Sequence, residues 1–95
     1  MTSPIRHERA EHGGAFLIEQ EGRQIGELYY QRAGARIVVT HTEVAPDMRE
    51  KGLGQLLIDA AVQWARAEKL TIVPRCSYAR AVLERTPEYG DVLAG

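Results

Sequence analysis

Hydrophobic and polar residues alternate through the first half of the chain, a pattern that predicts β-strands. Residues 15–20 and 25–32 are short runs of this kind, separated by a polar turn at residues 21–24. Residues 36–44 follow a second turn at residues 33–34 and are rich in β-branched side chains. Because short turns join these runs, we expect an antiparallel meander.

After residue 44 the pattern changes to the period of an α-helix. Apolar residues fall on one helical face: Leu53, Leu56, Leu57, Ala60, Ala61, Trp64 and Ala65. This helix should end near Lys69 and cover the sheet with its apolar face.

A shorter strand and a second helix are predicted after the long helix. Residues 71–73 form the strand, which Pro74 closes. Since a helix connects this strand to residues 36–44, the two strands should run parallel. Residues 78–85 are predicted as the second helix, and the tail at residues 88–95 as one further turn.

The predicted fold class is therefore α+β, and residues 1–95 are expected to form one domain. The antiparallel β-meander is followed by a long helix, a parallel strand and a short C-terminal helix. A short edge strand near residues 5–9 should precede the meander, with a break at Gly13-Gly14.

Composition and charge narrow the possible partners. The net charge of −1 gives no reason to expect nucleic-acid binding, and no apolar run reaches membrane-spanning length. The single cysteine, Cys76, forms no internal disulfide, which favours a reducing, cytoplasmic location. His7, His12 and His41 show no metal-ligand spacing alongside Cys76, so no metal is expected.

Residues 44–57 join the best predicted strand to the long helix through a glycine-containing loop. The free N–H groups and the dipole at a helix N-terminus favour a phosphate or pyrophosphate. Leu57 stands where a dinucleotide fingerprint has its third glycine, and Gln55 follows Gly54 where a nucleoside-triphosphate loop has lysine. Both of those nucleotide sites are therefore excluded.

The remaining pattern, Arg49-x-x-Gly52-x-Gly54, resembles the acyl-CoA-binding motif of the GNAT superfamily of N-acetyltransferases, Gln/Arg-x-x-Gly-x-Gly/Ala. Three further segments are similar to the compact one-domain branch of that superfamily: Val44-Ala45-Pro46, Val73-Pro74-Arg75-Cys76 and Thr86-Pro87-Glu88-Tyr89. The resemblance covers residues 15–93. It implies a GNAT-like fold in which the strands before and after the long helix splay apart.

The resemblance also implies that acetyl-CoA (coenzyme A) is the co-substrate. Backbone amides near residues 51–55 would bind its pyrophosphate, and Arg49 and Lys51 would add charged contacts. The expected cofactor-binding residues are Val44, Arg49, Glu50, Lys51, Gly52, Leu53, Gly54 and Gln55. The alternative is that the two glycines only shape a tight turn and that the basic side chains are solvated.

His41 and Glu43 are the candidates for the base that takes a proton from an acceptor amine. They are two residues apart on a strand and, without a bulge, share one face with Ile37 and Val39. A histidine titrates near the working pH, whereas a glutamate needs help from burial or a bound water. The alternative is a half-buried, hydrogen-bonded His41 and a solvated Glu43.

Cys76 and Tyr78 are further catalytic candidates that rest on the resemblance. It implies that Cys76 is a possible acetyl-accepting nucleophile, activated by the helix that begins near Ser77. It implies that Tyr78 is a possible proton donor to the departing thiolate. The alternatives are a small buried cysteine and a tyrosine packed at a helix start. Tyr29, Tyr30 and Tyr89 would either line an acceptor groove or pack against the sheet.

Three functions follow in order of preference. The first is an acetyl-CoA-dependent N-acetyltransferase acting on an unidentified amine, as a monomer or weak homodimer. The second is a non-catalytic acyl-CoA-binding or sensing module. The third is a small interaction domain whose loop is purely structural. Compared with larger GNAT enzymes, the chain has no room between its first strands for the helices that usually help to form the acceptor site.

Overall fold

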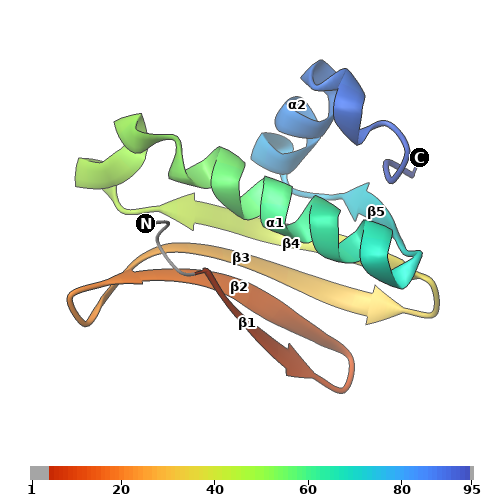
Figure 1. Cartoon of the computed structure of the whole chain (residues 1–95), viewed down its shortest axis with the longest axis horizontal. Helices are drawn as coiled ribbons and strands as arrows, with labels where there is room; N and C mark the ends of the chain where they lie inside the picture. The colour runs from red at the N-terminus through yellow and green to blue at the C-terminus, as the bar shows by residue number, and fades with distance from the viewer. Residues whose placement is uncertain (1–4, 95) are drawn as a thin grey trace.

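A five-stranded sheet with the strand order β1-β2-β3-β4-β5 is the base of the protein (Figure 1). The computed structural model describes residues 5–94, apart from the side chains of Arg49 and Glu50. The strands are β1 Ile5–Ala10, β2 Gly13–Gln20, β3 Arg23–Ala33, β4 Arg36–Val44 and β5 Thr71–Pro74. β1 to β4 are antiparallel, and β5 is parallel to β4. The predicted meander and the predicted parallel strand are confirmed.

Both α-helices pack against the same face of this sheet (Figure 1). The helical elements are the 3-10 turn η1 Pro46–Lys51, helix α1 Leu53–Glu68, helix α2 Ser77–Arg85 and the 3-10 turn η2 Pro87–Tyr89. In the described part of the chain the opposite face, called here the outer face, carries no helix. No described helix combines the length and apolar character needed to cross a membrane.

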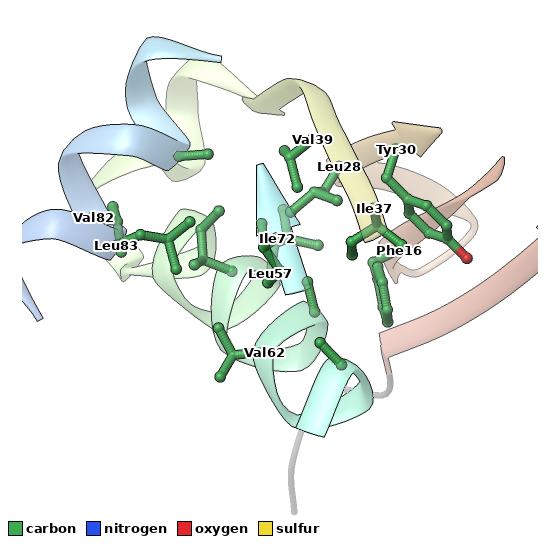
Figure 2. Packing of buried hydrophobic residues seen from close by; sticks show 14 of the residues in the cluster. Phe16, Leu28, Tyr30, Ile37, Val39, Leu57, Val62, Ile72, Val82 and Leu83 are labelled. Atoms are coloured by element: carbon green, nitrogen blue, oxygen red, sulfur yellow. The ribbon is translucent and has the colours of Figure 1, made fainter. Parts of the chain in front are cut away.

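The hydrophobic core lies between the sheet and the two helices. Figure 2 shows side chains from β2 to β5 meeting side chains from α1 and α2 in one cluster, among them Phe16, Leu28, Ile37, Val39, Leu57, Val62, Ile72, Val82 and Leu83. Each of these is at most 3% exposed. Complete burial of such a side chain is worth about 1.5–3 kcal/mol, so this cluster fixes the helices against the sheet.

A β-bulge interrupts the pairing of β3 with β4. Tyr30 pairs with Val39, but the preceding residue Tyr29 pairs with His41, so Thr40 has no partner across the ladder. A bulge inserts one extra residue and reverses the alternation of side chains beyond it.

The bulge corrects one expectation about β4. Ile37 and Val39 are 0% and 1% exposed and belong to the core, whereas His41 and Glu43 lie on the outer face. The prediction that all four share a face is therefore wrong, because it assumed unbroken alternation. Thr42 takes the inward position that follows Val39.

The expected break at Gly13-Gly14 is also wrong, because both glycines lie inside β2. The turn before β2 is formed by Glu11 and His12 instead. A Cβ on Gly14 would lie 2.6 Å from the hydroxyl of Tyr30, and one on Gly13 would lie 2.4 Å from its carbonyl oxygen. These glycines therefore allow close packing rather than a change of direction.

The C-terminal tail closes the edge of β5. The backbone N–H of Ile72 donates to the carbonyl of Val92 at 2.6 Å, and the N–H of Ala94 donates to the carbonyl of Ile72 at 2.8 Å. The buried Tyr89 donates from its hydroxyl to Asp59 of α1 at 2.9 Å. The predicted turn in the tail is η2, and the residues after it protect a sheet edge.

Candidate active site

β4 and β5 pair only as far as Val39 and Pro74, and beyond this point they diverge. The backbone N–H groups of Arg75 and Cys76 both donate to the carbonyl of Val39, at 3.0 and 3.1 Å. These two bonds turn the chain away from β4 toward α2. The predicted splaying of the two strands is thus confirmed.

A cavity of about 390 Å³ lies beside the diverging end of β4. Its lining residues come from β4, α1 and α2: Thr42, Glu43, Val44, Gly54 and Tyr78. We call it the helix-side cavity. It adjoins the first turn of α1, so a ligand held at that turn can extend along the C-terminal half of β4.

The loop before α1 has the backbone conformation that its glycine predicts. Gly52 has φ 73° and is the N-cap of α1, and a Cβ there would meet no atom within 4 Å. Glycine is therefore favoured at position 52 because the backbone there is left-handed, and not because neighbouring atoms would clash with a side chain. No side chain caps this helix, and its first turn contains no acidic residue. The N–H groups of the first turn are thus suited to an anion such as a pyrophosphate.

The other predicted cofactor residues differ in what the structure describes. Lys51 and Gln55 are exposed beside the loop, whereas Leu53 is buried in the core and can offer only its backbone. The side chains of Arg49 and Glu50 lie outside the described residues. Their predicted contacts with the cofactor therefore stay predictions.

An ion pair joins η1 to the start of β3. The guanidinium of Arg23 donates to both carboxylate oxygens of Asp47, at 2.7 and 3.1 Å. The hydrogen bonds from Arg23 lower the pKa of Asp47, so the pair persists to lower pH than an isolated aspartate would allow. This contact fixes the chain just before the anion-binding turn.

His41 lies on the outer face between two glutamates. Its Nε2 is 2.8 Å from Oε2 of Glu27 on β3 and 3.4 Å from Oε1 of Glu43, and its ring stacks on Tyr29 at 5.6 Å. Because a carboxylate only accepts, Nε2 carries the proton in these contacts and Nδ1 is left as the acceptor. The ligand atoms of the two glutamates and His41 lie within 4.8 Å of one another, close enough to share a proton or a cation. The expectation that the protein holds no metal stays a prediction.

Glu43 borders two cavities. Besides the helix-side cavity, it lines a polar cavity of about 270 Å³ together with Gln24, Ile25, Gly26, Glu27 and Ala45. We call this second space the outer cavity. The carboxylate of Glu43 lies on the outer face, 3.4 Å from His41 Nε2.

Glu27 is a site residue that the sequence analysis missed. It pairs directly with Glu43 across the β3–β4 ladder and is less exposed than either of its partners in the cluster. The hairpin turn sets the register of the two strands, but counting from Ala33 opposite Arg36 places Glu27 opposite Thr42, and only the bulge brings it opposite Glu43. The alternation of side chains along β4 gives no information about which residues of β3 lie beside them.

Cys76 and Tyr78 lie at the start of α2 but in different surroundings. Cys76 is the half-buried N-cap residue and packs at the margin of the hydrophobic core. Tyr78 is 39% exposed and lines the helix-side cavity. Among the other tyrosines, Tyr29 lies beside His41, whereas Tyr30 is buried.

The structure thus places three features near one another: the diverging parallel strands β4 and β5, the uncapped N-terminus of α1, and a cluster of His41 with Glu27 and Glu43 on β3 and β4. A family model described as GCN5-related N-acetyl-transferase matches residues 15–92. The chain belongs to this GNAT family, which uses acetyl-CoA, and it is therefore an acetyltransferase. Among curated protein sequences no significant match is found.

Solved structures share this fold. A GCN5-like protein from Staphylococcus aureus is 30% identical, with a TM-score of 0.76 over 100% of this chain and 92% of that one. The ribosomal-protein-S18-alanine N-acetyltransferase of Escherichia coli is 18% identical, with a TM-score of 0.69 over 81% of this chain and 53% of that one. An aminoglycoside N-acetyltransferase in complex with CoA is 17% identical, with a TM-score of 0.63 over 80% and 67%. The last two likenesses concern the fold alone.

Proposed function

We propose that the protein transfers an acetyl group from acetyl-CoA to an amine, with His41 as the base and Glu27 as its partner. The observation that carries this proposal is the place of the base cluster. Glu43 lines both the helix-side cavity, which adjoins the first turn of α1, and the polar outer cavity, and its carboxylate lies 3.4 Å from His41 Nε2. The cofactor would occupy the first cavity and the acceptor amine the second.

The donor side fits coenzyme A through the chain's own groups. The uncapped first turn of α1 offers backbone N–H groups to the pyrophosphate, with Lys51 exposed beside them. Gly52 holds the turn in its left-handed conformation. The bound cofactor supplies the acetyl group as a reactive thioester.

The acceptor side needs a group that takes one proton as the amine nitrogen forms its new bond to carbon. The free Nδ1 of His41 is this acceptor, because Nε2 is engaged by Glu27 at 2.8 Å. The carboxylates of Glu27 and Glu43 stabilise the imidazolium that results. Tyr78, which lines the helix-side cavity, is our candidate for donating a proton to the thiolate as the carbon–sulfur bond breaks, so that CoA leaves as a thiol.

Direct attack by the amine is proposed in preference to an acetylated cysteine. Cys76 is half-buried and packs at the margin of the hydrophobic core, where a thiol is normally an unreactive apolar contact. Replacing Cys76 by serine should therefore leave turnover close to that of the wild type. Loss of turnover in Cys76→Ser, with the fold intact, would point instead to an acyl-enzyme.

The test is amine-dependent release of CoA, measured over a panel of small amines and lysine-containing peptides. His41→Gln should lower kcat by about 10²–10⁴-fold, the usual contribution of a general base, and should leave the Kd of acetyl-CoA unchanged. Glu27→Gln should lower kcat as well. Glu19→Gln is the matched control, since it removes an exposed carboxylate that pairs with Arg6 and lies away from His41.

Each result separates the candidate functions. Binding of acetyl-CoA without turnover over the whole panel would contradict catalysis and favour the acyl-CoA sensor. Absence of acetyl-CoA binding would contradict both and favour a purely structural loop. Equal turnover in wild type and His41→Gln would remove His41 from the mechanism.

A further inference from the structure

Thr42 carries a buried hydroxyl that has no hydrogen-bond partner among the described residues. Its Oγ1 is enclosed, with an accessible area below 1 Å². Buried side-chain oxygens are normally hydrogen-bonded, because an unpaired one loses its contact with water and gains nothing in return. No other buried side-chain nitrogen or oxygen in the described part of the chain lacks a partner.

The bulge at Thr40 places this hydroxyl on the helix side of the sheet. If β4 continued past Val39 in unbroken alternation, with Thr40 paired to β3, Thr42 would face the outer side of the sheet. Instead it lines the helix-side cavity together with Val44, Gly54 and Tyr78. A valine would fill the same volume without an unpaired polar atom, so the hydroxyl is not explained by packing.

We infer that Thr42 is a cofactor-positioning residue whose hydroxyl hydrogen-bonds an amide of the pantetheine arm of acetyl-CoA. The inference rests on the proposed function, since it assigns the helix-side cavity to the cofactor. Thr42 lies on β4 between His41 and Val44. His41 is beside the proposed position of the acetyl group, and Val44 is nearer the proposed anion-binding loop. The part of the cofactor between its pyrophosphate and its thioester is the pantetheine arm, whose amides both donate and accept.

The side chain can make this contact without a backbone movement. The staggered wells of χ1 are about 120° apart, and rotation between them exchanges the hydroxyl and methyl positions of a threonine. The observed rotamer encloses the hydroxyl, so the proposed contact requires a rotation about χ1 that turns it toward the cavity lined by Thr42. A threonine hydroxyl can either donate to an amide carbonyl or accept from an amide N–H.

Two substitutions separate a ligand contact from a structural role. Thr42→Val keeps the shape and removes the hydroxyl, whereas Thr42→Ser keeps the hydroxyl. Calorimetry should show that Thr42→Val raises the Kd of both CoA and acetyl-CoA by about tenfold, the scale of one lost hydrogen bond. Thr42→Ser should stay within about threefold of the wild type. The melting temperature of ligand-free Thr42→Val should be equal to or higher than that of the wild type, because an unpaired buried hydroxyl has been removed.

Three results would overturn the inference. The first is unchanged affinity for CoA in Thr42→Val. The second is a loss confined to acetyl-CoA, which would place the hydroxyl at the acetyl group. The third is a clearly lower melting temperature of ligand-free Thr42→Val, which would show that the hydroxyl supports the fold. If wild-type protein binds neither CoA nor acetyl-CoA, the proposed function fails together with this inference. The first two results contradict only the role of Thr42, because each requires that the wild-type protein binds CoA or acetyl-CoA.

Discussion

His7 on β1 and Tyr30 on β3 are joined by a hydrogen bond of 2.6 Å that passes over the intervening strand β2. Gly14 makes this possible, since a Cβ there would lie 2.6 Å from the Tyr30 hydroxyl. The His7 ring also stacks on Phe16 at 4.0 Å with an interplanar angle of 12°. Three strands are therefore connected on their helix side by one imidazole.

This contact should make the stability of the protein depend on pH. Burial, with a smaller effect of the positive charge on Arg9, lowers the pKa of His7 from its ordinary value of 6.5. The folded state thus binds the His7 proton more weakly than the unfolded state does. The contribution of neutral His7 to the free energy of unfolding is therefore complete above pH 6.5 and is lost as the pH falls below that value. Melting temperatures measured from about pH 8 to about pH 5 should decline more steeply in the wild type than in His7→Gln.

The exposed His12 offers the matched control for this measurement. Its side chain is 85% exposed, in the turn between β1 and β2. His12→Gln should reproduce the wild-type decline. An equal decline in His7→Gln would show that other groups are responsible for the pH dependence.

Tyr78 and Gly54 form a second close contact, this time between α2 and α1. A Cβ on Gly54 would lie 2.4 Å from the Tyr78 hydroxyl and 2.8 Å from its Cζ. Gly54→Ala should displace the phenol into the helix-side cavity and raise the Kd of acetyl-CoA by about tenfold. Its effect on stability should stay within about 1 kcal/mol, because alanine favours the helix while the displaced side chain is partly exposed.

A double-mutant cycle measured by calorimetry checks this explanation. In the Tyr78→Ala background the alanine at position 54 has no phenol to displace, so Gly54→Ala should no longer change the affinity. Additive effects of the two substitutions would contradict the proposed clash.

The two exposed glycines Gly52 and Gly34 allow conformation and binding to be separated. Both have positive φ, 73° and 63°, and a Cβ on either would meet no atom within 4 Å. Alanine at either position should therefore cost about 1 kcal/mol of unfolding free energy through backbone strain. Only Gly52→Ala should also weaken acetyl-CoA binding, because Gly34 lies in the distant β3–β4 turn. Denaturant unfolding and calorimetry on both variants test this, and an equal loss of affinity in Gly34→Ala would contradict it.

The C-terminal tail should contribute measurably to stability through Tyr89. Its hydroxyl donates to Asp59 at 2.9 Å, and burial with this hydrogen bond raises the pKa of Tyr89. Tyr89→Phe should lower the unfolding free energy by about 1–2 kcal/mol, as expected for a partly buried hydrogen bond to a carboxylate. The combination of Tyr89→Phe with Asp59→Asn should cost no more than the larger single change. Strict additivity would show that the two residues act separately.

Local patterns explain how much of the fold could be predicted. β4 has the predicted bounds, and the change of period after it correctly indicated α1, since both signals depend on neighbouring residues. The bulge at Thr40 could not be predicted in this way, because it exists only when β3 and β4 pair. Gly13 and Gly14 were misleading for the same reason: the atoms that a Cβ would meet there belong to the neighbouring strands, the backbone of β3 at Gly13 and both the backbone of β1 and the Tyr30 side chain at Gly14.

In the candidate site, too, the features that depend on neighbouring residues could be predicted, and those that depend on pairing between strands could not. The loop motif correctly indicated the left-handed Gly52 and the helix start without a side-chain cap, and the spacing of His41 and Glu43 correctly placed them together on one face. Glu27 and Thr42 were missed, since one enters the site from the neighbouring strand and the other through the reversed parity beyond the bulge.

The extra residue in β4 has a consequence for how this strand can change during evolution. Thr40 is exposed and should accept many side chains. Deleting it would leave Val39 followed directly by His41, and regular alternation would then keep His41 opposite Tyr29, Thr42 opposite Leu28 and Glu43 opposite Glu27. The strand can therefore lose this one residue without reversing the side chains that follow it. Substitution and deletion at this position should both be tolerated, and the property that changes is the local twist of the strand.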